Sequence, residues 1–190
     1  MKKELDGRAI KLLFIIYIAA RAMAPGGRTF DTRRAYMTKI VESAKALMPK
    51  LVEIRRDFHE YPETSQNEVR TSEKVAAYLK KMGCDQVIEN VGGHGVIGII
   101  KGKKDGKTVA LRADMDALQI QEMNDVEYKS RNDGVMHACG HDNHMTGLLG
   151  AAELLCQNRD EICGTVKLVF QPAEEFSPIG GSRGMLESGY

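Results

Sequence analysis

Thiol, imidazole and carboxylate groups are concentrated in two short segments of this sequence. The first segment contains Cys139 with His141 two positions later, and the second ends in the adjacent glutamates Glu174 and Glu175. Cysteine, histidine and carboxylate side chains are the ligand types that hold zinc and related divalent ions. A glutamate next to a ligating glutamate can act as the base for a metal-bound water. The two segments together predict a metal-dependent hydrolytic site.

Each segment also has a simpler structural interpretation. A Cys-x-His pair can occur by chance in a loop, and two adjacent glutamates can be a solvated charge pair. Two other functions remain open on the residues alone: a non-catalytic metal-binding or interaction protein, or an enzyme in which Cys139 is a nucleophile and His141 its base. The pairing of Glu174 with Glu175 favours the hydrolytic metal site, because a purely structural zinc site does not require a base.

The length and composition are those of an ordinary globular domain. A chain of 190 residues, with 43% hydrophobic and 28% charged residues, can bury a core as one domain or one and a fraction. The formal net charge of +1 gives no field that would attract nucleic acid or a membrane surface, so neither partner is expected. The four cysteines are too few and too irregularly spaced for a disulfide scaffold. Free thiols in the cytoplasm are the expected state.

Residues 1–36 differ from the rest of the sequence. An apolar run from Leu12 to Ala20 follows several basic residues, which resembles a secretory signal and leaves export as the alternative to a cytoplasmic location. Glu4 and Arg21 disfavour a signal, since they dilute the basic leader and occupy the cleavage region. The run is also shorter than the ~20 residues of a transmembrane helix. Residues 1–36 are therefore predicted to be an N-terminal extension, signal-like or produced by a misassigned start, with the domain beginning at Met37.

Periodic apolar residues predict three helices and three strands after this extension. Helical spacing begins near Met37 and stops by Tyr61, and short runs rich in valine, isoleucine and leucine follow later. The predicted helices are 37–61, 69–82 and 143–156, and the predicted strands are 95–101, 108–112 and 165–170, with a turn at 104–106. A helix between two strands is typical of a parallel pair. The sequence therefore predicts an α/β layered domain with a central mixed, partly parallel sheet flanked by helices.

The candidate site residues fall at the ends of these elements. Asp114 and Asp116 follow one predicted strand, the segment with Cys139 precedes a helix, and Glu174 follows another strand. Because an α/β sheet usually places its ligand site at such ends, the three segments are expected to meet at one rim. The positive end of the helix dipole is also expected to favour the Cys139 thiolate.

The other histidines near these segments have structural interpretations. His59 is expected to end a helix through packing and hydrogen bonds. His137 and His144 flank the predicted metal site, where they either orient its ligands or serve only the fold.

Six segments of the sequence occur in the order and approximate spacing of one known family. They are 55–63 (RRDFHEYPE), 111–118 (LRADMDAL), 137–142 (HACGHD), 148–152 (LLGAA), 169–175 (VFQPAEE) and 180–185 (GGSRGM). Over 39–190 the sequence resembles the metal-dependent amidohydrolase branch of the aminoacylase and carboxypeptidase metallopeptidases. That branch includes hippurate hydrolase, N-acetyldiaminopimelate deacetylase and the plant hydrolases of auxin conjugates. Residues 1–36 match nothing in the family.

The resemblance implies a two-metal site with a role for each candidate residue. Cys139 would bridge the two ions, His141 and Glu175 would be further ligands, Glu174 would be the general base, and Asp116 would orient a ligand from behind. Zinc, manganese, cobalt and nickel all suit such ligands. The implied reaction is hydrolysis of the amide bond of an N-acyl amino acid or a short peptide.

The sequence departs from the family pattern in three places. Gln119 stands where a proline usually follows the Asp-Ala-Leu run, and Asp114 stands where more distant relatives have a metal-binding histidine. Relatives are also longer, and beyond the position of Tyr190 they supply two further histidine ligands and a lid domain that often dimerises. Residues 37–190 are therefore expected to be the N-terminal part of the catalytic domain, incomplete at the C-terminus. Such a chain is expected to be an inactive fragment, and a homodimer is expected only for the full-length form.

Overall fold

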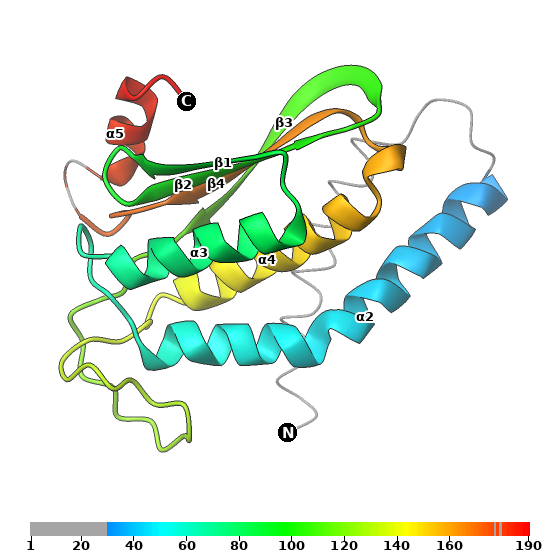
Figure 1. Ribbon diagram of the computed structural model, residues 1–190. Coiled ribbons are helices and arrows are strands. Elements are labelled where there is room, and N and C mark those ends of the chain that lie inside the picture. Colours follow the sequence, from blue (N-terminus) through cyan, green and yellow to red (C-terminus); the bar gives the residue numbers. More distant parts are fainter. Residues whose placement is uncertain (1–29, 177, 179) are drawn as a thin grey trace.

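One sheet and the helices packed on it form the part of the chain that the computed structural model describes (Figure 1). The described residues are 30–190 without 177 and 179, with side chains from 38 onward. In chain order the elements are α2 (Phe30–Glu60), α3 (Val69–Met82), β1 (Gln86–Val91), β2 (Gly95–Lys101), β3 (Lys104–Asp114), α4 (His141–Gln157), the 3-10 helix Arg159–Glu161, β4 (Cys163–Gln171) and α5 (Gly181–Glu187).

The sheet is mixed and has the strand order β1-β2-β4-β3. β1 pairs with β2, and β2 with β4, in antiparallel fashion, whereas β3 and β4 are parallel. The parallel pair is connected through α4, as a crossover between parallel strands requires. The predicted α/β class and the central mixed, partly parallel sheet are confirmed.

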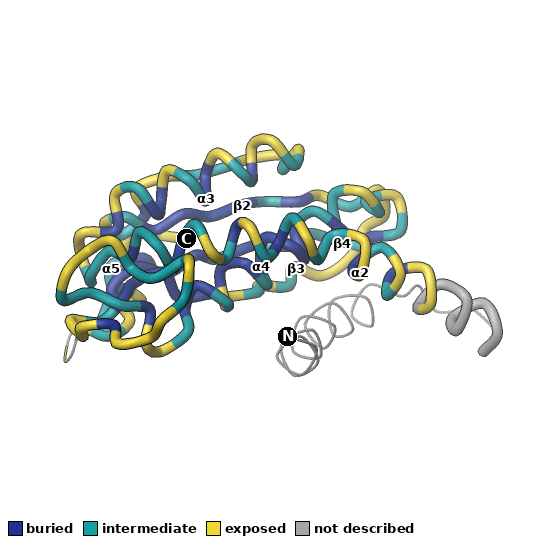
Figure 2. The backbone as a smooth tube through the Cα atoms, turned by 90° about the horizontal axis from the view of Figure 1, so that it is seen from below, coloured by how far each residue is buried: buried dark blue, intermediate teal, exposed yellow. Residues whose placement is uncertain are grey.

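The main core lies between the sheet and a layer of helices. α3 and α4 lie side by side on one face of the sheet, and α2 packs against α4 (Figure 1). Val96 of β2 and Phe170 of β4 are fully buried in this core with Phe58 of α2. The next residue of β2, Ile97, packs on the opposite face with Met185 of α5. Figure 2 shows the resulting pattern, with buried strands and exposed outer sides of the helices.

The helix α2 begins at Phe30 and therefore crosses the predicted boundary between 36 and 37. Residues 1–29, which include the apolar run, lie outside the described residues, so the N-terminal extension stays a prediction. Pro49 lies inside α2 and removes a backbone donor there, and Figure 1 shows the helix bending partway along its length. Among the helices of the described residues, none is both long and apolar enough to cross a lipid bilayer.

Three parts of the secondary structure differ from the sequence-based prediction. β1 is not predicted because Gln86, Glu89 and Asn90 are exposed on an edge strand and break the apolar alternation. α5 is not predicted because it spans 7 residues and includes glycines at its first and fourth positions. The predicted turn at 104–106 is wrong, because β3 already begins at Lys104. A register shift between Lys104 and Thr108 marks an irregularity of the strand, which explains its turn-like sequence.

The Gly180-Gly181 pair marks a close backbone approach at the start of α5. A Cβ atom on Gly181 would lie 1.9 Å from the carbonyl oxygen of Pro172, and the Gly181 N–H donates to the carbonyl of Ala173 at 2.9 Å. We expect Gly181→Ala to lower the free energy of unfolding by about 2 kcal/mol, because the two backbones cannot separate without losing this bond. The midpoint of urea unfolding measures the change. Ser182→Ala, at an exposed position of α5, is the control, and equal midpoints for the two variants would contradict the prediction.

Candidate metal centre

The C-terminal ends of β3 and β4 and the beginning of α4 meet at one edge of the sheet. β3 ends at Asp114 and β4 at Gln171, and these residues are partners in the parallel register. The N–H of Met115 then donates to the carbonyl of Gln171 at 2.9 Å, which holds the two departing segments together. α4 begins at His141. The three segments that were expected to converge do meet at this edge.

Cys139, His141 and Glu175 offer donor atoms that all lie within 4.8 Å of one another. Two donors bound to one zinc ion at about 2.0–2.3 Å lie at most about 4.6 Å apart, so small side-chain adjustments would suffice to hold one ion. Thiol sulfur, imidazole nitrogen and carboxylate oxygen are also the donor types that zinc and similar ions accept. The three residues therefore fit a divalent metal by both chemistry and position.

The imidazole of His141 is held in the orientation that a metal ligand needs. Its Nδ1–H donates to the backbone carbonyl of Asp116 at 2.8 Å, and the residue is 2% exposed. This bond places the proton on Nδ1 and leaves the lone pair on Nε2. Nε2 lies 3.9 Å from a carboxylate oxygen of Glu174 and 3.9 Å from one of Glu175. The free nitrogen of His141 therefore faces both glutamates.

Asp116 lies behind the candidate ligands and contacts two of their segments. Its Oδ2 accepts hydrogen bonds from the Ser65 hydroxyl at 2.7 Å and from the Glu175 N–H at 2.9 Å, while Oδ1 lies 3.3 Å from Nδ1 of His141. Burial alone would raise the pKa of this carboxyl, but the nearby His141 imidazole and the hydrogen bonds from Ser65 and the backbone outweigh it and lower the pKa to about 2. The ionised carboxylate is thus placed to position His141 and Glu175. Ser65 is a supporting residue that sequence analysis does not single out.

Glu68 supports the loop that carries the two glutamates. Its side chain is fully buried, and Oε1 accepts the N–H of Ala173 at 2.7 Å. Ala173 has a φ of 51°, in the left-handed region that non-glycine residues seldom adopt. Burial raises the pKa of the Glu68 carboxyl. In the sequence Glu68 looks like an N-terminal helix residue, yet its side chain makes no capping hydrogen bond to α3, so its role emerges only from the tertiary contact.

The thiol of Cys139 is exposed and surrounded by carboxylates. Its hydrogen bond with Glu175, burial, and the negative charges of Glu175, Glu174 and Asp114 raise its pKa. The carboxylates around the thiol therefore outweigh the effect of the nearby N-terminus of α4, on which the predicted thiolate rested. A raised pKa also disfavours Cys139 as a nucleophile, since the thiolate is the reactive form. The same negative charges favour a cation, and a thiol that coordinates a cation loses its proton.

A second set of donor atoms shares His141. Asp114, His141 and His144 offer atoms within 4.8 Å of one another, and Oδ2 of Asp114 lies 3.6 Å from Nδ1 of His144. The rings of His141 and His144 stack with their centroids 5.4 Å apart. A guanidinium nitrogen of Arg112 lies 2.6 Å from Oδ1 of Asp114 and competes with a cation for that carboxylate. Asp114 and His144 therefore border the site, and the stacking of His144 restrains the ring of His141.

A buried polar network supports the beginning of α4. The fully buried carboxylate of Asp142 accepts hydrogen bonds from Nε of Arg55 and Nδ1 of His59, each at 2.8 Å. On its other side, Nε2 of His59 lies 3.1 Å from Oε1 of Glu122. The hydrogen bond with Asp142 raises the pKa of His59, against the effect of burial. The expectation that His59 ends its helix through packing and hydrogen bonds is confirmed, while Glu122 is a partner that the sequence does not indicate.

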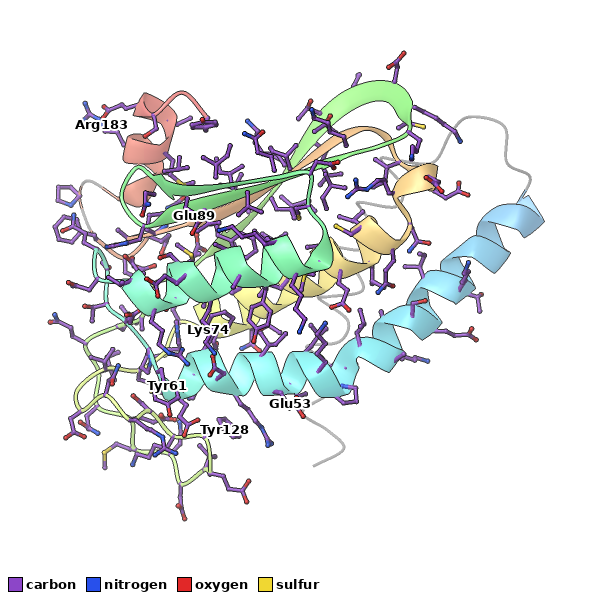
Figure 3. The ribbon with its side chains drawn as sticks, viewed as in Figure 1. Glu53, Tyr61, Lys74, Glu89, Tyr128 and Arg183 are labelled. Carbon is purple, nitrogen blue, oxygen red and sulfur yellow. The ribbon has the colours of Figure 1, made fainter. Side chains whose placement is uncertain are left out.

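The loop between β3 and α4 is attached to the end of α2 by aromatic contacts. Tyr128 lies edge-on to His59 with ring centroids 5.6 Å apart, and the guanidinium carbon of Arg56 lies 4.7 Å from the Tyr128 centroid. Figure 3 shows Tyr128 and Tyr61 at this end of α2. His137, in the same loop, is 4% exposed, and neither of its ring nitrogens has a hydrogen-bond partner among the described residues. Burial lowers the pKa of His137 to about 4, which favours the neutral form of this side chain.

The chain is similar in sequence to known peptidases and deacetylases. Residues 110–190 match the sequence model of peptidase family M20/M25/M40. The chain is 51% identical over 152 residues to thermostable carboxypeptidase 1 of Saccharolobus solfataricus, which covers 80% of the chain and 38% of the relative. It is 46% identical over 145 residues to N-acetylcysteine deacetylase of Bacillus subtilis, which covers 76% of the chain and 38% of the relative. The chain thus spans less than two fifths of the length of these curated relatives.

A solved structure agrees in both fold and sequence. The YXEP protein of Bacillus subtilis, a dinuclear metal binding peptidase from the M20 family, has a TM-score of 0.71 and 45% sequence identity to this chain. The likeness covers 76% of this chain and 40% of that one. The segment that matches the family contains Cys139, His141 and Glu175, whose donor atoms lie together at the edge of the sheet. These matches, together with the shared fold, relate residues 110–190 to peptidase family M20/M25/M40.

Proposed function

We propose that this chain supplies metal ligands and the general base of a metal-dependent amidohydrolase. The observation that carries the proposal is the position of Glu174 and Glu175, each with a carboxylate oxygen 3.9 Å from the free nitrogen of His141. One carboxylate can then serve as a ligand while its neighbour takes part in proton transfer. A site that only bound metal would have no need of the second carboxylate.

The proposed roles follow from burial and orientation. Cys139, His141 and Glu175 would hold the metal, with two ions in a complete site, while Asp116 positions two of these ligands. A divalent ion there polarises a carbonyl and lowers the pKa of a bound water. The side chain of Glu174 is 39% exposed, so it can reach both solvent and the ligand set. Glu174 would accept a proton from the attacking water and return it to the departing amine.

The proposed substrate is an N-acyl amino acid or a short peptide, hydrolysed at its amide bond. Two relatives support this class, since one is a carboxypeptidase and the other an N-acetylcysteine deacetylase. Zinc, manganese, cobalt and nickel remain the candidate metals. A cytoplasmic location, with thiols kept reduced, belongs to the same proposal.

Removal of one ligand is expected to release the metal. Cys139→Ala should weaken zinc affinity by at least about 100-fold, because a donor from the set is lost and the remaining imidazole and carboxylate hold the ion less well. Elemental mass spectrometry after dialysis against a weak chelator measures zinc per chain. Cys163→Ala is the matched control, because Cys163 begins β4 and belongs to neither donor set. Equal zinc content in the two variants would exclude Cys139 as a ligand.

Hydrolysis of N-acetyl amino acids, with and without a chelator, tests the function itself. The full-length form, loaded with metal, should release free amino acid, lose this activity in chelator and regain it when metal is restored. Metal binding by the folded full-length form without any hydrolysis would overturn the enzymatic proposal and leave a metal-binding protein. Activity that survives the chelator but is abolished by thiol alkylation would instead identify Cys139 as a nucleophile.

A further inference from the structure

Two cysteines outside the metal centre lie together where α3 and α4 end. Cys84 follows Gly83, the residue that terminates α3, and Cys156 lies in the last turn of α4. Their thiols lie close enough to influence each other's pKa, and both side chains are half-buried against the main core. α3 and α4 lie side by side on the sheet in Figure 1. The two thiols are therefore in contact although they belong to different helices.

Arg159 fixes the position of the two thiols relative to each other. Its guanidinium group donates to Oδ1 of Asp85 at 2.7 Å and to the carbonyl of Gly83 at 2.5 Å, and it also hydrogen-bonds Cys156. The segment with Cys84 is held on its other side by β2, since the Asp85 N–H donates to the carbonyl of Ile99 at 2.8 Å. Hydrogen bonds therefore hold the segment that carries Cys84 in place from two sides, through Arg159 and through β2.

We propose that Cys84 and Cys156 form a reversible intramolecular disulfide by exchange with a low-molecular-weight disulfide such as oxidised glutathione. The pair is separate from the metal centre, because Cys156 lies in the last turn of α4 whereas His141 begins that helix. In a reducing compartment the two residues remain thiols, and the cross-link forms when the disulfide pool rises.

The order of attack follows from the surroundings of the two thiols. The neighbouring Cys84 thiol and the Arg159 guanidinium lower the pKa of Cys156 to about 7, whereas Cys156 and burial raise the pKa of Cys84. The Cys156 thiolate therefore attacks glutathione disulfide first, forming a mixed disulfide and releasing one glutathione thiolate. Cys84 then loses its proton to solvent and attacks the Cys156 sulfur. The second glutathione leaves as its thiolate, so two protein thiols are oxidised and one glutathione disulfide is reduced to two thiols.

The cross-link would join two segments that are far apart in sequence. It would tie the end of α3 to the end of α4 and enclose the residues between 84 and 156, including the whole of β1, β2 and β3. Closing a loop of this length restricts the unfolded chain more than the folded one. The oxidised protein should therefore unfold at a higher temperature, by about 5 °C or more, and the shift should disappear after reduction with dithiothreitol.

Peptide mapping of the whole chain tests the proposal. The protein is incubated in glutathione buffers of increasing oxidised fraction, quenched with an alkylating reagent, digested without reduction and analysed by mass spectrometry. A peptide that joins Cys84 to Cys156 and disappears on reduction is expected, whatever the state of the exposed Cys139. Alkylation of both Cys84 and Cys156 in fully oxidised buffer, with the protein still folded by circular dichroism, would overturn the proposal. So would a cross-link from Cys84 to Cys139 or Cys163.

Two variants test the assigned order of attack. Cys84→Ser should stop at the mixed disulfide and carry glutathione on Cys156, whereas Cys156→Ser should leave Cys84 alkylatable. Cys163→Ser is the matched control and should form the Cys84–Cys156 link like the unchanged chain. Glutathione found on Cys84 of the Cys156→Ser variant, as fast as on Cys156 of the Cys84→Ser variant, would contradict the order.

Discussion

Replacing Glu174 by glutamine in the full-length form is expected to lower amide hydrolysis by about 100- to 10,000-fold while the metal content stays unchanged. Glutamine keeps the size and the hydrogen-bonding shape of the side chain but cannot take up a proton from water. The ligand set of Cys139, His141 and Glu175 is untouched by the change. Asp116 still accepts the backbone N–H of Glu175, so the loop should keep its shape. The loss should therefore appear in kcat.

The matched experiment separates the two adjacent glutamates. Glu174→Gln and Glu175→Gln are compared for zinc per chain and for release of amino acid from an N-acetyl substrate, with Glu187→Gln on α5 as an exposed control. Glu175→Gln should lose zinc as well as activity, whereas the control should change neither. A Glu174→Gln variant that keeps more than a tenth of the activity would show that Glu174 is not the base. Loss of zinc in that variant would assign Glu174 to the ligand set instead.

The longer helices and the central strands were accessible from sequence because their signals are local. α3 has the predicted bounds of 69–82, since its apolar stripe stops at Gly83, whose φ of 86° suits only glycine well. β2 likewise has the predicted bounds of 95–101, because both of its faces are covered and every residue before Lys101 is apolar or glycine. β1 could not be predicted in this way, as an edge strand with exposed polar residues has no periodic signal.

The candidate metal ligands were accessible for a different reason. Cys139, His141 and Glu175 stand out by residue type, and their approach to one another follows from the ends of parallel strands. The residues that support them do not stand out. Ser65 and Glu68 are polar residues near the start of a helix, and only the folded chain brings them under Asp116 and Ala173. A hydrogen bond between residues that are remote in sequence cannot be recognised from the sequence around either residue.

Asp142→Asn is expected to lower the free energy of unfolding by about 3–5 kcal/mol, a large part of the 5–15 kcal/mol typical of a domain. The carboxylate is fully buried and forms charged hydrogen bonds with Arg55, at 2.8 Å, and with His59, at 2.8 Å. An amide removes the negative charge and can present its own donors to those two groups. Since the Arg55 side chain is only 17% exposed, water can compensate only in part for the loss.

Chemical denaturation followed by circular dichroism measures this effect, with Asp125→Asn on the exposed loop as the charge-matched control. The Asp142 variant should unfold at a lower urea concentration and about 10 °C below the unchanged chain, while the control should shift by no more than about 0.5 kcal/mol.

His59→Gln should account for part of the same loss, and the double variant should cost less than the sum of the two single changes because the residues interact. Additive single effects would mean that Asp142 and His59 contribute independently. A normal unfolding midpoint for Asp142→Asn would mean that this carboxylate does not stabilise the fold.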